Sequence, residues 1–255
     1  GNNWEADWYT SGGARIKVFE EVVAFPPNAK IGNFSPAPSE RHGNIITWKI
    51  QNQTNWTLEI KVPYELSDTI DVPLFLQDSM PWGDDIYAHN TSPADDIGQW
   101  GCLTTSGAMI ENFLANSQDN DDLTDPGELN AWLTTNDGYT ANNGVRHAWV
   151  GKHARGANTS MYWNKSVSYD TTTLNYYLRS GYPVILGVKP TVVDGRTFPG
   201  HYVVATGITT RNNTPTYTIN DPAYGNTTLL EKWGNHALQM ILFSASEANQ
   251  QLITF

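Results

Sequence analysis

Three residues with side chains suited to acyl transfer occur along the chain in the order Cys102, His201 and Asp221. A thiolate is a strong nucleophile, an imidazole can accept and return a proton near neutral pH, and a carboxylate can orient the imidazole. Cys102 is the single cysteine of the chain, so an internal disulfide and a cysteine-built metal site are both excluded. The thiol is therefore either inert or reactive.

The residues that follow Cys102 predict that the cysteine opens a helix. Apolar side chains recur at helical spacing in CLTTSGAMIENFLAN, at Met109, Ile110, Phe113 and Leu114. The first turn of a helix favours negative charge, and its free N–H groups can bind an oxyanion. A lone cysteine is more often a small buried apolar residue, so this position alone does not decide between the two interpretations.

The partners of the thiol are expected on two neighbouring strands. The segment GHYVVATGI makes His201 the first residue of an apolar strand, and INDPAYG places Asp221 at the end of the next one. In an antiparallel pair the start of one strand lies beside the end of the following strand, which brings Asp221 to His201. Taken singly, His201 is typical of a structural histidine and Asp221 of a turn before Pro222. The order of all three residues favours a Cys-His-Asp triad.

The elements that must position these residues change from helices to strands along the chain. Helices are predicted at 125–135, where Asp125 and Glu128 form a capping box, and at 170–180. Strands are predicted at 183–189, 201–208, 216–221, 227–233 and 238–244. This order predicts an α+β domain with a largely antiparallel sheet.

The N-terminal part of the chain has a different pattern. Residues 14–25 and 45–62 alternate between apolar and polar side chains and are predicted strands, whereas the Pro- and Asn-rich stretch between them is a predicted loop. We therefore divide the chain into a small β-rich segment, residues 1–68, and a catalytic domain, residues 69–255. The segment is either an SH3-like module or an extension of the catalytic domain.

Charge and composition restrict the partners. The net charge of -11 and the absence of any basic run disfavour nucleic acid and anionic membrane surfaces. No apolar stretch is long enough to cross a bilayer, and the start GNNWEADWYT lacks the features of a signal peptide. We expect a secreted or surface-exposed bacterial protein whose signal peptide has been removed. The oligomeric state does not follow from the sequence.

At the level of whole motifs, the chain resembles a known family. The ordered set VPLFLQ, GCLTTSGAMI, LRSGYPVILGV, GHYVVATG and INDPAYG resembles the bacteriocin-leader-processing, double-glycine peptidase-like branch of the papain-like cysteine peptidases, over roughly residues 72–235. The resemblance implies a papain-like fold in which Cys102 is the nucleophile, His201 the general base and acid, and Asp221 the orienting acceptor. It also implies that an upstream glutamine donates to the oxyanion, and it requires neither a metal nor an organic cofactor.

Two of these roles have rival residues. Gln77 ends VPLFLQ as the family motif would have it, but Gln99 lies only three residues before Cys102, and the spacer after Gln77 is longer than the family often has. Asn220 competes with Asp221, because papain itself uses an amide to orient its histidine.

Other polar and aromatic residues near these motifs are candidates for weaker roles. Trp82, Trp100 and Gly200 are candidates for substrate binding, although ordinary packing is the usual role of a single tryptophan. The remaining histidines match no compact zinc motif, so no metal site is predicted.

These observations predict hydrolysis of a peptide or amide bond, in a peptide or protein substrate, through an acyl-enzyme thioester. The alternatives are an acyltransferase or peptidoglycan amidase with the same triad, and a catalytically silent papain-like binding domain.

Overall fold

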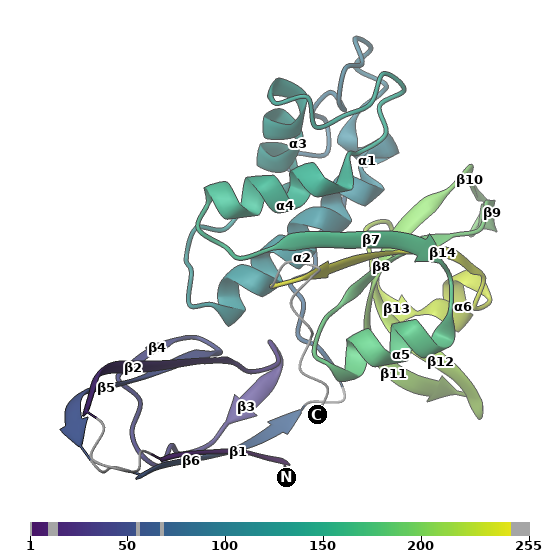
Figure 1. Ribbon diagram of the computed structural model, residues 1–255. Helices are drawn as coiled ribbons and strands as arrows, with labels where there is room; N and C mark the ends of the chain where they lie inside the picture. The colour runs from purple at the N-terminus through teal and green to yellow at the C-terminus, as the bar shows by residue number, and fades with distance from the viewer. Residues whose placement is uncertain (1, 10–14, 55–56, 67–68, 246–255) are drawn as a thin grey trace. The chain divides into compact units, whose positions relative to one another are not determined.

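A computed structural model describes residues 2–9, 15–54, 57–66 and 69–245. The chain divides into two compact units, residues 1–67 with 117–119, and residues 68–116 with 120–255 (Figure 1). Parts of both predicted domains, residues 1, 10–14, 55–56, 67–68 and 246–255, lie outside the described residues.

The first unit consists of two antiparallel sheets of three strands each, ordered β1-β6-β3 and β2-β5-β4. The strands are β1 (Asn2–Tyr9), β2 (Arg15–Ala24), β3 (Ala29–Ile31), β4 (Glu40–His42), β5 (Ile45–Thr54) and β6 (Thr57–Leu66). The buried core of this unit comprises Val23, Phe25, Ile46, Trp48, Ile60 and Val62.

The predicted loop between the strands of this unit is partly wrong, because β3 and β4 lie within it. Both are short edge strands that pair with one neighbour each, β6 and β5 respectively. Backbone hydrogen bonding to a long neighbouring strand outweighs the turn-rich composition there, and composition gives no sign of such pairing.

The second unit contains six helices and a large sheet within its described residues. The helices are α1 (Ile97–Trp100), α2 (Cys102–Ser117), α3 (Pro126–Thr135), α4 (His147–Gly156), α5 (Thr171–Arg179) and α6 (Leu229–Trp233). The sheet strands are β7 (Tyr162–Ser168), β8 (Val184–Val188), β11 (His201–Arg211), β12 (Thr214–Asp221), β13 (Gly225–Thr228) and β14 (Ala237–Ser244). A separate hairpin joins β9 (Thr191–Val193) to β10 (Arg196–Phe198).

The large sheet has the order β13-β12-β11-β8-β14-β7, and every neighbouring pair is antiparallel. Apart from β7, the sheet follows the first five helices in the sequence. The predicted α+β class, with helices preceding a largely antiparallel sheet, is therefore confirmed.

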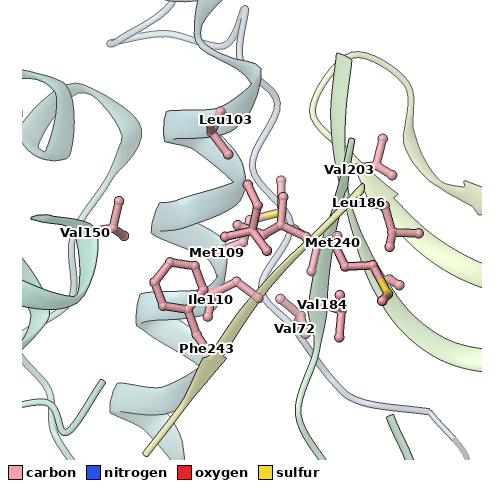
Figure 2. Packing of buried hydrophobic residues seen from close by; sticks show 14 of the residues in the cluster. Val72, Leu103, Met109, Ile110, Val150, Val184, Leu186, Val203, Met240 and Phe243 are labelled. Carbon is pink, nitrogen blue, oxygen red and sulfur yellow. The ribbon is translucent and has the colours of Figure 1, made fainter. Parts of the chain in front are cut away.

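Helix α2 is the centre of this unit. Every residue from Leu103 to Ala115 is buried, because α4 packs on one side of α2 and the sheet on the other (Figure 2). Met109 and Ile110 extend from α2 toward the sheet, and Val150 of α4 lies on the opposite side of α2. A helix enclosed on all sides gives Cys102, at its first residue, a rigid support.

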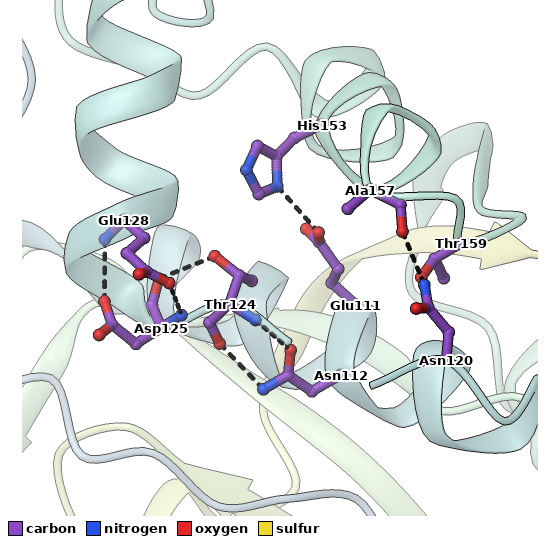
Figure 3. A network of polar contacts seen from close by, with 9 residues as sticks. All are labelled: Glu111, Asn112, Asn120, Thr124, Asp125, Glu128, His153, Ala157 and Thr159. Atoms are coloured by element: carbon purple, nitrogen blue, oxygen red, sulfur yellow. Dashed lines mark hydrogen bonds and ion pairs between the residues drawn. The ribbon is translucent and has the colours of Figure 1, made fainter. Parts of the chain in front are cut away.

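Polar side chains on and after α2 are paired in spite of their burial (Figure 3). The amide of Asn112 exchanges two 2.9 Å hydrogen bonds with the backbone of Thr124. Glu111 contacts Nδ1 of His153 in α4 at 2.8 Å. Buried polar groups of this kind need partners to offset their lost hydration, and these pairs join α2 to its neighbours.

Two predicted helix caps are present, but one predicted strand is wrong. Asp125 and Glu128 form the predicted capping box of α3, and Asp170 accepts from the backbone of Thr173 at the start of α5. The predicted strand 227–233 is wrong: only β13 continues to Thr228, and residues 229–233 form α6. Thr228 caps this helix by accepting from the backbone of Glu231, so local capping outweighs the β-branched composition.

Candidate active site

Cys102 stands at the junction of two helices. The short helix α1 ends at Gly101, and α2 begins at Cys102. A Cβ atom at position 101 would lie 2.4 Å from Cγ2 and 2.6 Å from the carbonyl oxygen of Ile97, so only glycine fits at this junction. The free thiol of Cys102 is only partly buried. It lies at the N-terminal end of α2, where the helix dipole favours negative charge.

His201 and Asp221 form a buried pair on β11 and β12. Nε2 of His201 lies 2.7 Å from Oδ1 of Asp221, and the two side chains are 2% and 0% exposed. The strands are antiparallel, with Val204 opposite Asn220, so the first residue of β11 lies near the last residue of β12. The predicted juxtaposition of His201 and Asp221 is therefore present.

The carboxylate of Asp221 accepts three hydrogen bonds. Oδ1 accepts from Nε2 of His201 at 2.7 Å and from the backbone N–H of Ala223 at 2.8 Å. Oδ2 accepts from the indole Nε1 of Trp233 at 2.8 Å. Both oxygens are thus held by donors, which prevents rotation of the carboxylate away from His201.

The ring of His201 interacts with Cys102 as well. Since Nε2 faces Asp221, Nδ1 is the ring nitrogen available to the thiol. Burial lowers the pKa of His201, but hydrogen bonds and charge interactions with Asp221 and Cys102 outweigh burial and raise this pKa to about 9. The imidazole is therefore protonated at neutral pH, and its charge faces the carboxylate of Asp221.

Aromatic side chains enclose the histidine. The indole of Trp233 stacks on the ring of His201 with 5.1 Å between centroids, and Phe198 lies at 5.0 Å. Phe198 and Trp233 meet edge to face at 5.2 Å. Their apolar surfaces keep water from the bond between His201 and Asp221, which strengthens it.

The contact of Trp233 with Asp221 is not expected from the sequence, because residues 227–233 are predicted there as a strand. A strand would have alternated the side chains and given no reason to place the indole near Asp221. The spacing from Thr228 to Glu231 is the signature of a helix N-terminus, and it is the signal that would have identified α6.

Gln77 is held between the triad strands and the loop before Cys102. Its backbone N–H donates to the carbonyl of Pro222 at 2.9 Å, and its Nε2 donates to the carbonyl of Gly98 at 2.7 Å. The side chain is 1% exposed, and its Oε1 has no hydrogen-bond partner. Gln77 thus lies between the residue after Asp221 and the helix that precedes Cys102.

The rival residues lie in different surroundings. Gln99 is exposed, and its backbone N–H donates to the carboxylate of Asp96 at the start of α1. The Nδ2 of Asn220 donates to the carbonyl of Val72 at 2.8 Å, and its Oδ1 accepts from Asn226. Asn220 therefore fastens the segment that leads to Gln77, and Asp221 makes the hydrogen bond with His201.

The candidate substrate-binding residues are not gathered in one place. The indole of Trp82 donates to the carbonyl of Leu76 at 2.8 Å and is partly buried. Trp100 is 42% exposed and donates to Asp95. Gly200 lines a cavity beside His201, and neither tryptophan lines it.

Arg196 of the β9–β10 hairpin is a further residue at this site that sequence reasoning missed. Its Nη2 donates to the carbonyl of Gly98 at 3.3 Å, the same oxygen that accepts from Gln77. Its guanidinium also lies 4.9 Å from the ring of Phe198. The hairpin is thereby tied to the helix that precedes Cys102, a contact between residues 98 apart in the chain that local patterns do not show.

Two further features concern the described residues of the chain. Among them no three His, Cys, Asp or Glu side chains gather as a metal ion would require. None of their helices has both the length and the apolar character needed to span a membrane.

A central helix that begins at a cysteine, beside an antiparallel sheet that carries a His–Asp pair, is the arrangement expected of a cysteine-peptidase-like domain. The model of the Peptidase_C39 like family matches residues 69–240, more than half of the chain, and the chain belongs to this family. The resemblance noted from the sequence motifs is thus confirmed.

Other comparisons add little. A solved structure of a variant of the Salmonella effector SpvD is similar at 13% sequence identity with a TM-score of 0.33, covering 69% of this chain and 87% of that chain. No curated protein matches the chain significantly.

Proposed function

We propose that this protein hydrolyses a peptide or amide bond in peptide or protein substrates, with Cys102 as nucleophile. The observation that carries the proposal is the buried pair of His201 and Asp221, whose Nε2 and Oδ1 atoms lie 2.7 Å apart. Cys102 is near enough to this pair to contribute to the raised pKa of His201. Membership of a cysteine-peptidase-like family supports the same conclusion.

The proposed reaction has two half-reactions that use the same histidine. In the reactive pair of Cys102 and His201 the shared proton lies on the imidazole, and the thiolate attacks the substrate carbonyl carbon. The C–N bond then breaks as His201 returns the proton to the leaving amine, which leaves a thioester on Cys102. Water attacks the thioester while His201 takes its proton, the C–S bond breaks, and the thiol is restored.

The oxyanion of each tetrahedral intermediate needs donors close to Cys102. We assign this role to the backbone N–H of Cys102 and to Gln77. Nε2 of Gln77 carries two hydrogens, one of which goes to Gly98, so the second remains for the oxyanion. Burial of Gln77 supports this choice over Gln99, whose exposed side chain would have to be ordered first.

Alkylation by iodoacetamide tests the pairing of thiol and imidazole directly. Cys102 is the single cysteine, so the rate of adduct formation, followed by mass spectrometry, reports on this thiol alone. We expect appreciable alkylation at pH 6, where an ordinary free thiol is almost fully protonated. His201→Ala is expected to abolish the reaction at this pH while leaving it at pH 9.

A matched control is His236→Ala, because His236 is exposed and is not part of the proposed site. This variant is expected to keep the alkylation profile of the wild type. An ordinary thiol profile in the wild type, unchanged by His201→Ala, would contradict the proposal.

Product analysis separates hydrolysis from the alternatives. Incubation with peptide mixtures and with cell-wall fragments, followed by mass spectrometry, distinguishes cleaved peptides from transferred acyl groups or released cell-wall peptides. A reactive Cys102 with no turnover of either substrate would favour the silent binding domain.

A further inference from the structure

A cavity of about 590 Å³ opens directly beside His201. One end is formed by Pro199, Gly200 and His201, and the other by Ser166 and Ser168 of β7. Between them it extends over β11, β8 and β14, which are consecutive neighbours in the sheet. The cavity therefore extends from the proposed catalytic base across four strands.

The floor of the cavity is polar because of a glycine. Tyr202 and Gln239 are the cross-strand neighbours of Gly187 on its two sides. Nε2 of Gln239 donates to the hydroxyl of Tyr202 at 2.7 Å, passing over Gly187. A Cβ at position 187 would lie 2.7 Å from Cγ of Gln239 and 3.1 Å from Cε1 of Tyr202, so any larger residue would disturb this bridge.

The bridge leaves one donor and one acceptor for a ligand. The hydroxyl of Tyr202 accepts from Gln239 and keeps its own proton to donate, and Oε1 of Gln239 keeps its lone pairs. If the side-chain amide of Gln239 were rotated by half a turn, its oxygen would accept from the hydroxyl of Tyr202. The amide N–H would then be the free donor, and the hydroxyl oxygen of Tyr202 the free acceptor. Burial raises the pKa of Tyr202, so this hydroxyl stays neutral at physiological pH.

No Lys, Arg, Asp or Glu is among the described residues that line the cavity. His201, at the mouth, already pairs with Asp221. A charged side chain that entered would therefore lose water without gaining an ion pair of its own. An apolar side chain would leave the donor and the acceptor of the floor unpaired. The lining also contains the apolar side chains of Val167, Val188 and Leu238, so it matches best an uncharged polar group carried on a short apolar stem.

We propose that this cavity is a substrate subsite for an uncharged polar side chain, best matched by the carboxamide of Gln or Asn, on the acyl side of the scissile bond. A carboxamide offers one acceptor and one donor, complementary to Tyr202 and Gln239. We assign the cavity to the acyl side because its floor lies beside the helix of the nucleophile. Ser106, one turn of α2 after Cys102, contacts the carbonyl of Tyr202 at 3.5 Å, and Cys102 would hold the acyl group. This inference rests on the proposed function.

Peptidyl chloromethyl ketones, which alkylate a reactive thiol after binding in a substrate cleft, provide the test. Two series of N-acetyl dipeptidyl probes are used, with Gln, Leu, Glu or Lys at the first or second residue before the reactive carbon. The second-order rate of Cys102 modification is measured by mass spectrometry for each. In one of the series we expect the Gln probe to react about tenfold faster than the Leu probe, the ratio that one neutral hydrogen bond supplies.

Three variants test the residues of the floor. Tyr202→Phe and Gln239→Leu are each expected to reduce the ratio of Gln to Leu rates toward one, and Gly187→Ala is expected to do the same by disturbing the bridge. A ratio measured on one protein cancels any general loss of thiol reactivity. Tyr176→Phe, on the exposed side of α5, is the matched control and should keep the wild-type ratio.

The outcomes separate this inference from the proposed function. If iodoacetamide reports a paired thiol but the Gln and Leu probes react equally in both series, the subsite is wrong and the function stands. The same holds if a charged or apolar probe is preferred, or if no peptidyl probe reacts. An ordinary iodoacetamide profile that His201→Ala leaves unchanged overturns the function itself, whatever the probes show.

Discussion

At the scale of single residues, the donors around Asp221 explain why a carboxylate stands there. Three N–H groups, from His201, Ala223 and Trp233, converge on its two oxygens. An amide side chain has only one acceptor oxygen, and its NH₂ group would face one of these donors. An asparagine in this position would therefore leave at least one buried N–H without an acceptor.

We predict that Asp221→Asn destabilises the protein by about 2 kcal/mol, the usual cost of an unsatisfied buried donor. It should also lower the pKa of His201, because the carboxylate contributes to raising that pKa. Urea unfolding measures the first effect, and titration of the ring by NMR measures the second.

Asn220→Asp serves as the control at the adjacent position. The amide of Asn220 donates to the carbonyl of Val72 and not to His201. This variant should leave the pKa of His201 higher than Asp221→Asn does. If both variants give the same pKa, Asp221 is not the partner that controls the ring.

The pKa of His201 also predicts how stability depends on pH. A histidine whose pKa is raised in the folded state to about 9 binds a proton more tightly there than in the unfolded chain. Its stabilising contribution is full below about pH 6.5, the ordinary value for histidine, and is lost as the pH rises through 9. The difference in unfolding free energy between the wild type and His201→Ala should therefore shrink over this range. A constant difference from pH 6 to pH 9.5 would refute the assignment.

At the scale of elements, one long-range hydrogen bond joins the β9–β10 hairpin to the helix that precedes Cys102, in addition to its contacts with Tyr224 and Lys232. Arg196 donates to the carbonyl of Gly98, which also accepts from Gln77. Removing the guanidinium loosens the hairpin on the side of Gly98 and leaves Gln77 as the side-chain donor to this oxygen.

We predict that Arg196→Ala increases hydrogen exchange of the backbone amides of residues 191–198 and slows modification of Cys102 by peptidyl probes several-fold. Arg196→Lys keeps the charge but not the planar fork, and should restore the rate only in part. Lys232→Ala is a matched comparison, because Lys232 pairs with Asp194 of the same hairpin at 2.7 Å without contacting Gly98. Equal slowing of the probe reaction by Lys232→Ala would show that general loosening of the hairpin, rather than the Gly98 contact, is responsible.

The contact between α2 and α4 contains a second buried ionisable pair. Glu111 is fully buried, contacts His153 at 2.8 Å through Oε1, and has an Oε2 without a partner. Burial raises the pKa of Glu111 in spite of His153. The pair is part of the network in Figure 3.

We predict that His153→Ala destabilises the protein by about 3 kcal/mol at pH 7, because it leaves a buried carboxylate without its partner. The loss should be smaller at pH 5, where the raised pKa of Glu111 allows more of the carboxyl to become neutral. His89→Ala, at an exposed position, is the control for removal of an imidazole. Denaturant unfolding at both pH values tests this, and a greater loss at pH 5 would contradict the prediction.

At the scale of the whole molecule, the described residues form two separate hydrophobic cores. The core around Trp48 and Ile60 has no member in common with the core around α2 and the large sheet. We therefore propose that residues 69–255 form an independent catalytic domain, and that the role of residues 1–68 is distinct from chemistry.

We predict that a chain starting at residue 69 folds and keeps the iodoacetamide reactivity of Cys102 at pH 6. Circular dichroism and the alkylation rate of the shortened and full chains provide the comparison. A soluble shortened chain with an ordinary thiol would mean that the N-terminal segment helps to build the site.

Much of the fold follows from local patterns. The helix from Cys102, the capping box at Asp125 and the cap at Asp170 depend on residues within one or two turns, so the sequence displays them directly. The strand that begins at His201 and the one that ends at Asp221 are apolar runs bounded by Gly and Pro, and they are equally visible.

The sequence by itself determined the α+β class, the position of Cys102 at a helix start, and the pairing of His201 with Asp221, because each depends on short-range pattern or on two consecutive strands. Only the tertiary structure decided that Trp233 covers this pair, that Arg196 and Gln77 share the carbonyl of Gly98, and that Gly187 lies beneath a polar bridge. Most of these contacts join segments that lie far apart in the chain. The contact of Trp233 depends on a helix at residues 229–233, where local propensity favours a strand. Their existence depends on how helices and sheet pack, and a single sequence does not record that packing.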